Sequence, residues 1–264
     1  MQEDYQQRFG GVGRVYGRAA MATLQQLHVC VIGIGGVGSW AAEALARSGV
    51  GEITLIDHDD LCETNINRQI HALDSTIGRS KVDVMAARIA DIHPACRCHA
   101  VDDHVTSGNL ARHLACGYDA VIDAIDSIRF KTDIIYYCKR NKIPVITTGG
   151  AGGLTDPTRI QVSDLTRTFN DPLAAKVRNR LRHDYGWTGN PKRRFGVDCV
   201  FSSEQPRYPR ADGSIGLEKP GVHGLTLDCS LGYGSLSMVT ASFGLTAAAR
   251  ILNRMMEKQH NIHE

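Results

Sequence analysis

A short segment between residues 55 and 69, LIDHDDLCETNINRQ, combines side chains that bind different parts of a nucleotide. Asp57, at the end of a predicted strand, is placed to accept hydrogen bonds from a ribose. Arg68 adds a guanidinium, which binds phosphate oxygens bidentately and stays charged. Asn65 and Gln69 lie beside it with side-chain amides. These types and this spacing predict a site for a nucleotide with a charged phosphate tail.

A glycine-rich turn precedes that segment. VIGIGGVGS supplies Gly33, Gly35 and Gly38 in G-x-G-x-x-G spacing, with Gly36 between them. Without side chains the backbone can approach a phosphate, and the helix that follows offers free N–H groups at its N-terminus. The alternative is a tight strand-to-helix turn with no ligand. The turn alone does not distinguish NAD from ATP.

Two further charged residues favour a triphosphate. Lys81 begins a predicted helix and is placed to add a second cation near a leaving pyrophosphate. Asp126, in VIDAIDS, follows a predicted strand at the edge where open α/β sheets bind ligands. A carboxylate that faces two cations and a triphosphate is a natural Mg²⁺ ligand. Taken singly, Arg68, Lys81 and Asp126 also fit a loop ion pair, a solvated lysine and a helix cap.

The elements that must position these residues alternate between apolar runs and helical periodicity, which predicts a doubly wound sheet. Strands are predicted at 28–34, 52–57, 97–105, 120–125, 143–148, 159–165 and 197–202, and helices at 36–48, 78–92, 107–116 (capped by Ser107), 127–141 and from 171. The fold class is α/β: a Rossmann-like mixed sheet whose parallel N-terminal half is continued by a partly antiparallel C-terminal half. We expect one adenylating domain, with a nucleotide-binding half at about 1–150 and a substrate half at 151–264. Residues 184–222 are predicted to form a mobile loop over the site.

Composition limits the class of protein. The 264 residues are 42% hydrophobic, and the formal net charge is only +2, so a nucleic-acid contact requires a local basic patch. The N-terminus is polar and the eight cysteines show no secreted spacing, which favours the cytoplasm. Residues 229–249 carry no charge and are long enough to cross a membrane. Their many hydroxyl side chains favour a buried helix over a membrane-associated one.

A basic stretch at 175–194, AKVRNRLRHDYGWTGNPKRR, supplies such a patch. Its cations are Lys176, Arg178, Arg180, Arg182, Lys192, Arg193 and Arg194. Tyr185 and Trp187 lie among them, and basic residues interleaved with aromatics suit a phosphate backbone with a splayed base. The alternative is a solvated helix face. We predict that this stretch binds RNA.

GIGGVGS, LIDHDDLCETNINRQ, GRSKVD and DAIDS together resemble the ubiquitin-activating-enzyme superfamily, in the bacterial branch of the molybdopterin- and thiamine-synthesis adenylyltransferases. The resemblance implies that a carboxylate attacks the α-phosphate of ATP and gives an acyl-adenylate and pyrophosphate. It implies that Asp57 holds the ribose, that Asp126 binds Mg²⁺, and that Arg68 and Lys81 stabilise the developing charge. The implied ATP-binding set is Gly33, Gly35, Gly36, Gly38, Asp57, Asp59, Asn65, Arg68, Gln69, Lys81 and Asp126, and Arg68, Lys81 and Asp126 are the implied catalytic residues.

The sequence departs from the sulfur-carrier activators. It has no C-x-x-C pair, so no structural zinc is expected, and no cysteine lies between Cys138 and Cys199. QRFGGVGRVYG and DCSLGYGS instead resemble the tRNA threonylcarbamoyladenosine dehydratases. That resemblance implies ATP-dependent closure of the threonylcarbamoyl side chain of a tRNA adenosine to a cyclic oxazolone, with release of AMP and pyrophosphate.

The same resemblance implies partners besides tRNA. It implies a homodimer in which an N-terminal arginine, Arg8 or Arg14, reaches the partner's ATP. It also suggests a cysteine-desulfurase partner with Cys229 as the sulfur acceptor; the alternative, which a cysteine in an apolar stretch favours, is a buried structural thiol. Three alternative functions stay open: a sulfur-carrier adenylyltransferase, a nicotinamide oxidoreductase, which gives Arg68 and Lys81 no purpose, and an adaptor that docks sulfur-transfer proteins without turnover.

Overall fold

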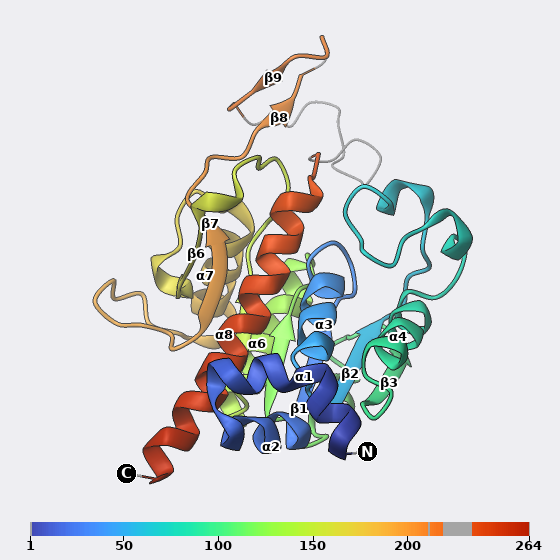
Figure 1. Cartoon of the computed structure of the whole chain (residues 1–264). Helices are drawn as coiled ribbons and strands as arrows, with labels where there is room; N and C mark the ends of the chain where they lie inside the picture. The colour runs from blue at the N-terminus through green and yellow to red at the C-terminus, as the bar shows by residue number, and fades with distance from the viewer. Residues whose placement is uncertain (1, 211, 219–233, 264) are drawn as a thin grey trace.

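A seven-stranded sheet forms the centre of the computed structural model, which describes residues 2–210, 212–218 and 234–263 (Figure 1). The strand order is β3-β2-β1-β4-β5-β7-β6. The strands are β1 (His28–Ile32), β2 (Glu52–Asp57), β3 (Arg97–Asp102), β4 (Ala120–Asp123), β5 (Val145–Thr148), β6 (Ile160–Asp164) and β7 (Asp198–Ser202). All neighbours pair in parallel except β6, which pairs with β7 in the antiparallel sense. The predicted mixed sheet is therefore confirmed.

Helices cover both faces of this sheet. One face carries α2 (Arg18–Gln26), α3 (Gly38–Arg47), α4 (Lys81–Ile92) and α8 (Ser237–His263), which share a single apolar core with the sheet. The other carries α5 (Leu110–Leu114), α6 (Ile128–Arg140) and α7 (Pro172–Tyr185). Because β1, β4 and β5 are covered on both faces, their side chains are almost all buried and their sequences read as continuous apolar runs.

The last helix packs against the helix that follows the glycine turn. A Cβ at Gly244 of α8 would lie 2.3 Å from the carbonyl oxygen of Val37 and 2.8 Å from the backbone nitrogen of Ala41. Only glycine permits so close an approach. The helix that follows the glycine turn is thus covered by α8, which lies about 200 residues later in the chain (Figure 1).

Several short elements lie outside the main sheet and the longer helices. They are η1 (Glu63–Asn65), η2 (Asp74–Thr76), η3 (Pro157–Arg159), η4 (Leu165–Arg167) and the hairpin of β8 (Tyr208–Pro209) and β9 (Ile215–Gly216). Within 184–218 the structure shows the end of α7, the strand β7 where a strand was predicted at 197–202, and a hairpin. The mobility expected of 184–222 stays a prediction. Residues 219–222 lie outside the described ranges.

Other boundaries also differ from the prediction. Two helices, α1 (Gln2–Tyr16) and α2, precede the first strand and have no counterpart in the prediction. The α5 helix begins at Leu110, so Ser107 does not cap it; its hydroxyl donates to Asp133 at 2.7 Å instead. The α8 helix begins at Ser237 inside the charge-free stretch and continues well beyond it. Among the described residues, no helix combines the length and the apolar character needed to cross a membrane.

Candidate nucleotide-binding site

The glycine turn lies at the carboxyl edge of the sheet, between β1 and α3. Gly33 has a φ of 86°, and its N–H donates to the carbonyl of Ile56 in β2 at 2.8 Å. A Cβ at Gly38 would lie 1.7 Å from the carbonyl oxygen of Gly33. Both positions therefore require glycine, and the turn brings the N-terminus of α3 directly over the end of β1.

Asp57 is bound to this turn. One carboxylate oxygen accepts a hydrogen bond from the Ile34 N–H at 2.6 Å, and the other accepts from the Asp59 N–H at 2.9 Å. Each carboxylate oxygen has lone pairs beyond the one used here. The carboxylate is thus oriented by the backbone while it retains acceptors for two ribose hydroxyls.

Arg68 and Gln69 lie against the glycines. A Cβ at Gly36 would be 3.1 Å from Cγ of Arg68, and a Cβ at Gly35 would be 4.0 Å from Nε2 of Gln69. The short helix η1 positions them, since the Asn65 carbonyl accepts from both backbone N–H groups, at 3.0 and 2.9 Å. The structure thus brings these residues together at the glycine turn, as the sequence predicts.

Two buried polar atoms at this position have no hydrogen-bond partner among the described residues: Oε1 of Gln69 and Oγ of Ser39. Ser39 lies in the first turn of α3, next to Gly38. Buried polar atoms without partners are uncommon in proteins and costly. Their place beside the glycine turn fits a polar ligand that supplies the missing bonds.

Trp40 is a residue that sequence reasoning missed. Its indole N–H donates to the Arg68 carbonyl at 3.0 Å and ties the arginine segment to α3. The Arg68 guanidinium donates to the Thr64 carbonyl at 2.6 Å and to Oδ1 of Asn67 at 3.0 Å. The only sequence signal was a tryptophan two residues after the last glycine of the motif. Trp40 thus holds the backbone of Arg68, and Asn67 holds its guanidinium.

Lys81 is buried, with 6% of its surface exposed, and its ammonium lies 2.6 Å from a carboxylate oxygen of Asp59. Burial raises the pKa of Asp59, but the hydrogen bond and charge of Lys81 outweigh it and hold that pKa below its ordinary value. Lys81 is therefore not a solvated first-turn lysine. Its ammonium is fixed by Asp59, which follows the end of β2 and is itself bonded to Asp57 through its backbone N–H.

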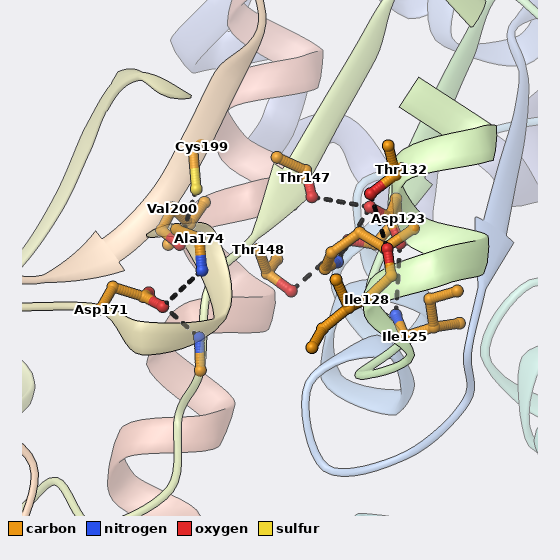
Figure 2. Close-up of polar contacts among 12 residues, drawn as sticks. Asp123, Ile125, Ile128, Thr132, Thr147, Thr148, Asp171, Ala174, Cys199 and Val200 are labelled. Atoms are coloured by element: carbon orange, nitrogen blue, oxygen red, sulfur yellow. Dashed lines mark hydrogen bonds and ion pairs between the residues drawn. The ribbon is translucent and has the colours of Figure 1, made fainter. Parts of the chain in front are cut away.

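The two aspartates of VIDAIDS differ in environment. Asp123 is buried at the end of β4, 2.8 Å from the Lys131 ammonium and 2.6 Å from the Thr147 hydroxyl (Figure 2 shows the carboxylate and its threonine). Burial raises the pKa of Asp123, and Lys131 opposes that rise. Asp126, three residues later, is exposed, and no hydrogen bond or ion pair joins it to another residue in the described ranges. Asp123 is a structural carboxylate, whereas Asp126 is free to bind a ligand.

Asp171 joins the second half of the chain to this edge. It caps α7 by accepting from the Ala174 N–H at 2.9 Å, and it accepts from the Gly150 N–H at 3.1 Å (Figure 2). Burial raises the pKa of its carboxyl. The GGAGG turn after β5 is thereby fixed relative to α7.

The predicted RNA-binding cations differ in exposure and in their partners. Arg178 donates to the Leu165 carbonyl and the Thr168 hydroxyl, Arg180 pairs with Asp184 at 2.8 Å, and Arg182 lies over the Phe195 ring at 5.7 Å. Lys176, Lys192, Arg193 and Arg194 are exposed. Residues 192–194 precede the start of β7, which runs parallel to β5. They therefore lie at the amino edge of the sheet, opposite the glycine turn.

Arg8 and Arg14 also lie away from the glycine turn of their own chain. Both are on α1, which packs at the amino edge, where Tyr5 donates to the Gly49 carbonyl at 2.8 Å. Cys229 lies outside the described residues, so the prediction that it accepts sulfur stays a prediction.

Comparisons with known proteins all point to one family. The sequence profile of the ThiF family matches residues 9–264. The chain is 55% identical over 255 residues to the tRNA threonylcarbamoyladenosine dehydratase of Escherichia coli (strain K12), covering 96% of this chain and 95% of the relative. It is 47% identical over 196 residues to the dehydratase of the same name from Bacillus subtilis (strain 168), covering 74% of each.

The solved structures that resemble this chain include one that carries the same enzyme name as these relatives. The crystal structure of the E. coli dehydratase, TcdA, in complex with ATP is 53% identical, with a TM-score of 0.87 over 97% of this chain and 96% of that one. A structure named TcdA (CsdL) has a TM-score of 0.91 and 53% identity and covers 98% of both chains. This chain therefore belongs to the ThiF family, in the branch of the tRNA threonylcarbamoyladenosine dehydratases.

Proposed function

We propose that this chain uses ATP to close the threonylcarbamoyl side chain of a tRNA adenosine to its cyclic oxazolone form. The observation that carries the proposal is the convergence of Asp57, Arg68 and Gln69 on the glycine turn. The E. coli relative has been solved with ATP and with AMP bound. An AMP-forming reaction fits a site with a ribose acceptor at one end and cations at the other.

The chemistry needs two displacements. A carboxylate oxygen of the threonyl group attacks the α-phosphorus of ATP, and pyrophosphate leaves. The carbamoyl oxygen then attacks the activated carbonyl carbon, and AMP leaves with the former carboxylate oxygen while the carbamoyl group loses a proton. Arg68 and Lys81 stabilise the negative charge that develops on the phosphates. Neither displacement needs a cysteine nucleophile.

Mg²⁺ fits this site through Asp126. Asp59 is paired with Lys81 and Asp57 accepts from two backbone N–H groups, whereas Asp126 is exposed and without a partner among the described residues. Mg²⁺ is commonly bound by one or two carboxylates together with substrate phosphates. Bound there, the ion would neutralise charge on the leaving pyrophosphate.

Further parts of the proposal concern partners and place. The protein acts in the cytoplasm as a homodimer, and Arg8 or Arg14 contributes to the partner's site. The exposed cations Lys176, Lys192, Arg193 and Arg194 bind the tRNA backbone, and Arg178, Arg180 and Arg182 act by positioning that surface. A cysteine desulfurase delivering sulfur to Cys229 remains a separate proposal.

The decisive experiment measures AMP and pyrophosphate release from ATP with two substrates offered separately: tRNA that carries threonylcarbamoyladenosine, and a sulfur-carrier protein ending in Gly-Gly. We expect release with the tRNA alone, together with the cyclic nucleoside by mass spectrometry. Release with the carrier alone would instead establish a sulfur-carrier adenylyltransferase.

Arg68→Ala should lower AMP release by about 100- to 1000-fold, the usual effect of removing one group that stabilises developing charge. Arg47→Ala is the matched control, since Arg47 lies at the far end of α3 and shares Glu43 with Arg88. Cyclic product at the wild-type rate in the Arg68 variant would remove the central cation from the proposal.

A further inference from the structure

At the amino edge of the sheet, away from the nucleotide site, three adjacent strands each place one metal-ligating side chain on the same face. His28 of β1 is in register with Glu52 of β2, and Thr54 of β2 is in register with His99 of β3. Because alternate residues of a strand share a face, Glu52 and Thr54 point the same way and so do their partners. The parallel register therefore brings two imidazoles and a carboxylate together.

The ligand atoms of these residues converge. Nε2 of His99 lies 2.8 Å from Oε1 of Glu52, and Nδ1 of His28 lies 3.6 Å from the same oxygen. All three atoms lie within 4.8 Å of one another. Ligands of a tetrahedral ion with bonds of about 2.0–2.1 Å are separated by roughly 3.3–3.5 Å. The three atoms need only small side-chain movements to meet that geometry.

The surrounding groups hold two of the ligands in place. Nε2 of His28 hydrogen-bonds Oγ1 of Thr54 at 2.9 Å, and the ring meets Tyr118 edge-on with centroids 4.7 Å apart. Arg97 bonds the second oxygen of Glu52. Such outer contacts orient metal ligands in known sites. His99, 50% exposed, leaves an entry path from solvent.

In the part of the chain that the structure describes, Arg97 is the positive charge near these ligands that opposes a cation. Its side chain is 65% exposed, so it can move into solvent at little cost. The carboxylate of Asp119 also lies near His28, whose backbone N–H donates to it at 2.8 Å. Glu52 and Asp119 together therefore supply two negative charges against a divalent ion.

We propose that Nδ1 of His28, Oε1 of Glu52 and Nε2 of His99 bind one Zn²⁺ ion, with water as a fourth ligand. Two imidazoles with one carboxylate suit zinc and disfavour the hard ions Mg²⁺ and Ca²⁺. The ion would join the edge strand β3 to β2 and β1, so its effect is on stability. A search for cysteine pairs misses such a site, since its ligands come from three strands.

The test uses the full-length protein after chelation and dialysis, with Zn²⁺ and Co²⁺ as probes. His99→Asn removes the most exposed ligand, and His183→Asn is the matched control because His183 is 91% exposed and paired with Asp184 on α7. We expect the wild type and the His183 variant to bind one more Zn²⁺ per chain than the His99 variant. Zn²⁺ should raise the melting temperature of the first two only.

The Co²⁺ spectrum distinguishes this site from the free thiols of the chain. Absorption typical of tetrahedral nitrogen and oxygen ligands that disappears in the His99 variant supports the proposal. Equal stoichiometry in all three proteins, or binding that shows only thiolate-to-cobalt charge transfer, overturns it. Because ATP binds at the opposite edge, AMP release with modified tRNA should be the same in all three proteins, so either proposal can fail alone.

Discussion

The backbone N–H of Ile34 donates a 2.6 Å hydrogen bond to the carboxylate of Asp57, which joins the glycine turn to the end of β2. The glycine turn and Asp57, the proposed phosphate and ribose sites, are therefore positioned relative to each other by the fold itself. Preorganised groups of this kind do not need to be reordered during catalysis. Substitutions in the turn can therefore distinguish an effect on ATP affinity from an effect on the free energy of unfolding.

Gly35 and Gly38 should respond differently to alanine. A Cβ at Gly38 would lie 1.7 Å from the Gly33 carbonyl, so Gly38→Ala should destabilise the fold by roughly 1–3 kcal/mol or more. At Gly35 the atom nearest to an added Cβ would be Nε2 of Gln69, at 4.0 Å, so Gly35→Ala should keep the unfolding free energy within about 0.5 kcal/mol.

Gly35→Ala should nevertheless weaken ATP binding at least about tenfold, because the methyl group occupies the space that a phosphate approaches. Calorimetric titration with ATP and urea unfolding measure the two effects. Unchanged ATP affinity in this variant would show that the nucleotide does not contact the turn at Gly35.

Asp123 and Asp126 should be separable by conservative variants. Asp123→Asn leaves Lys131 buried without its carboxylate and should cost roughly 3–5 kcal/mol of stability. Asp126→Asn should leave stability unchanged and lower AMP formation by roughly 100-fold or more, since it removes the proposed Mg²⁺ ligand. Titration of the rate with Mg²⁺ is the check, and a wild-type Mg²⁺ dependence in Asp126→Asn would remove that residue from the metal site.

His71 should make the protein sensitive to mild acid. It is 2% exposed, neither ring nitrogen has a hydrogen-bond partner among the described residues, and burial lowers its pKa from 6.5 to about 4. Between these pH values the unfolded chain binds more protons than the folded one, so the free energy of unfolding falls as the pH drops from 6.5 towards 4. The loss should reach about 3 kcal/mol.

His71→Leu should flatten this dependence, because the leucine cannot be protonated and no hydrogen bond is lost. Urea unfolding at pH 7 and pH 4.5 gives the comparison, with the exposed His183→Asn as the control. An equal acid-induced loss in His71→Leu and the wild type would assign the effect to other groups.

Arg193 and Arg194 should affect tRNA affinity but not chemistry, because they lie at the edge of the sheet opposite the glycine turn. Replacing both with alanine should reduce the slope of log affinity against log salt concentration by about two. The rate of cyclisation at saturating tRNA should be unchanged. Filter binding across a salt series measures the slope, and an unaltered slope would place the RNA on another surface.

The sequence predicted best where local pattern determines structure. The glycine turn, the Asp57 strand and the segment from Asn65 to Gln69 are continuous motifs, and their convergence follows from the rule that parallel strands end at one edge. The mixed sheet followed from the same alternation of strands and helices.

Sequence patterns could not predict the features that depend on contacts between distant segments. Trp40 bonds Arg68, and Lys131 neutralises Asp123, yet neither pairing has a sequence signature. The basic stretch shows the same limit: its charge is visible in the sequence, but the direction of β7 decides at which edge Arg193 and Arg194 lie. That the stretch binds RNA stays a prediction. Arg178 and Arg182 are used within the fold, against Thr168 and Phe195.

The close packing of α8 on α3 has a consequence for biosynthesis. A ribosome produces Gly33 to Arg68 long before it produces Gly244, whose missing side chain allows the two helices to meet. A nascent chain therefore exposes the apolar surface of α3 until α8 has emerged. Competence to consume ATP should therefore appear only after Gly244 has left the ribosome.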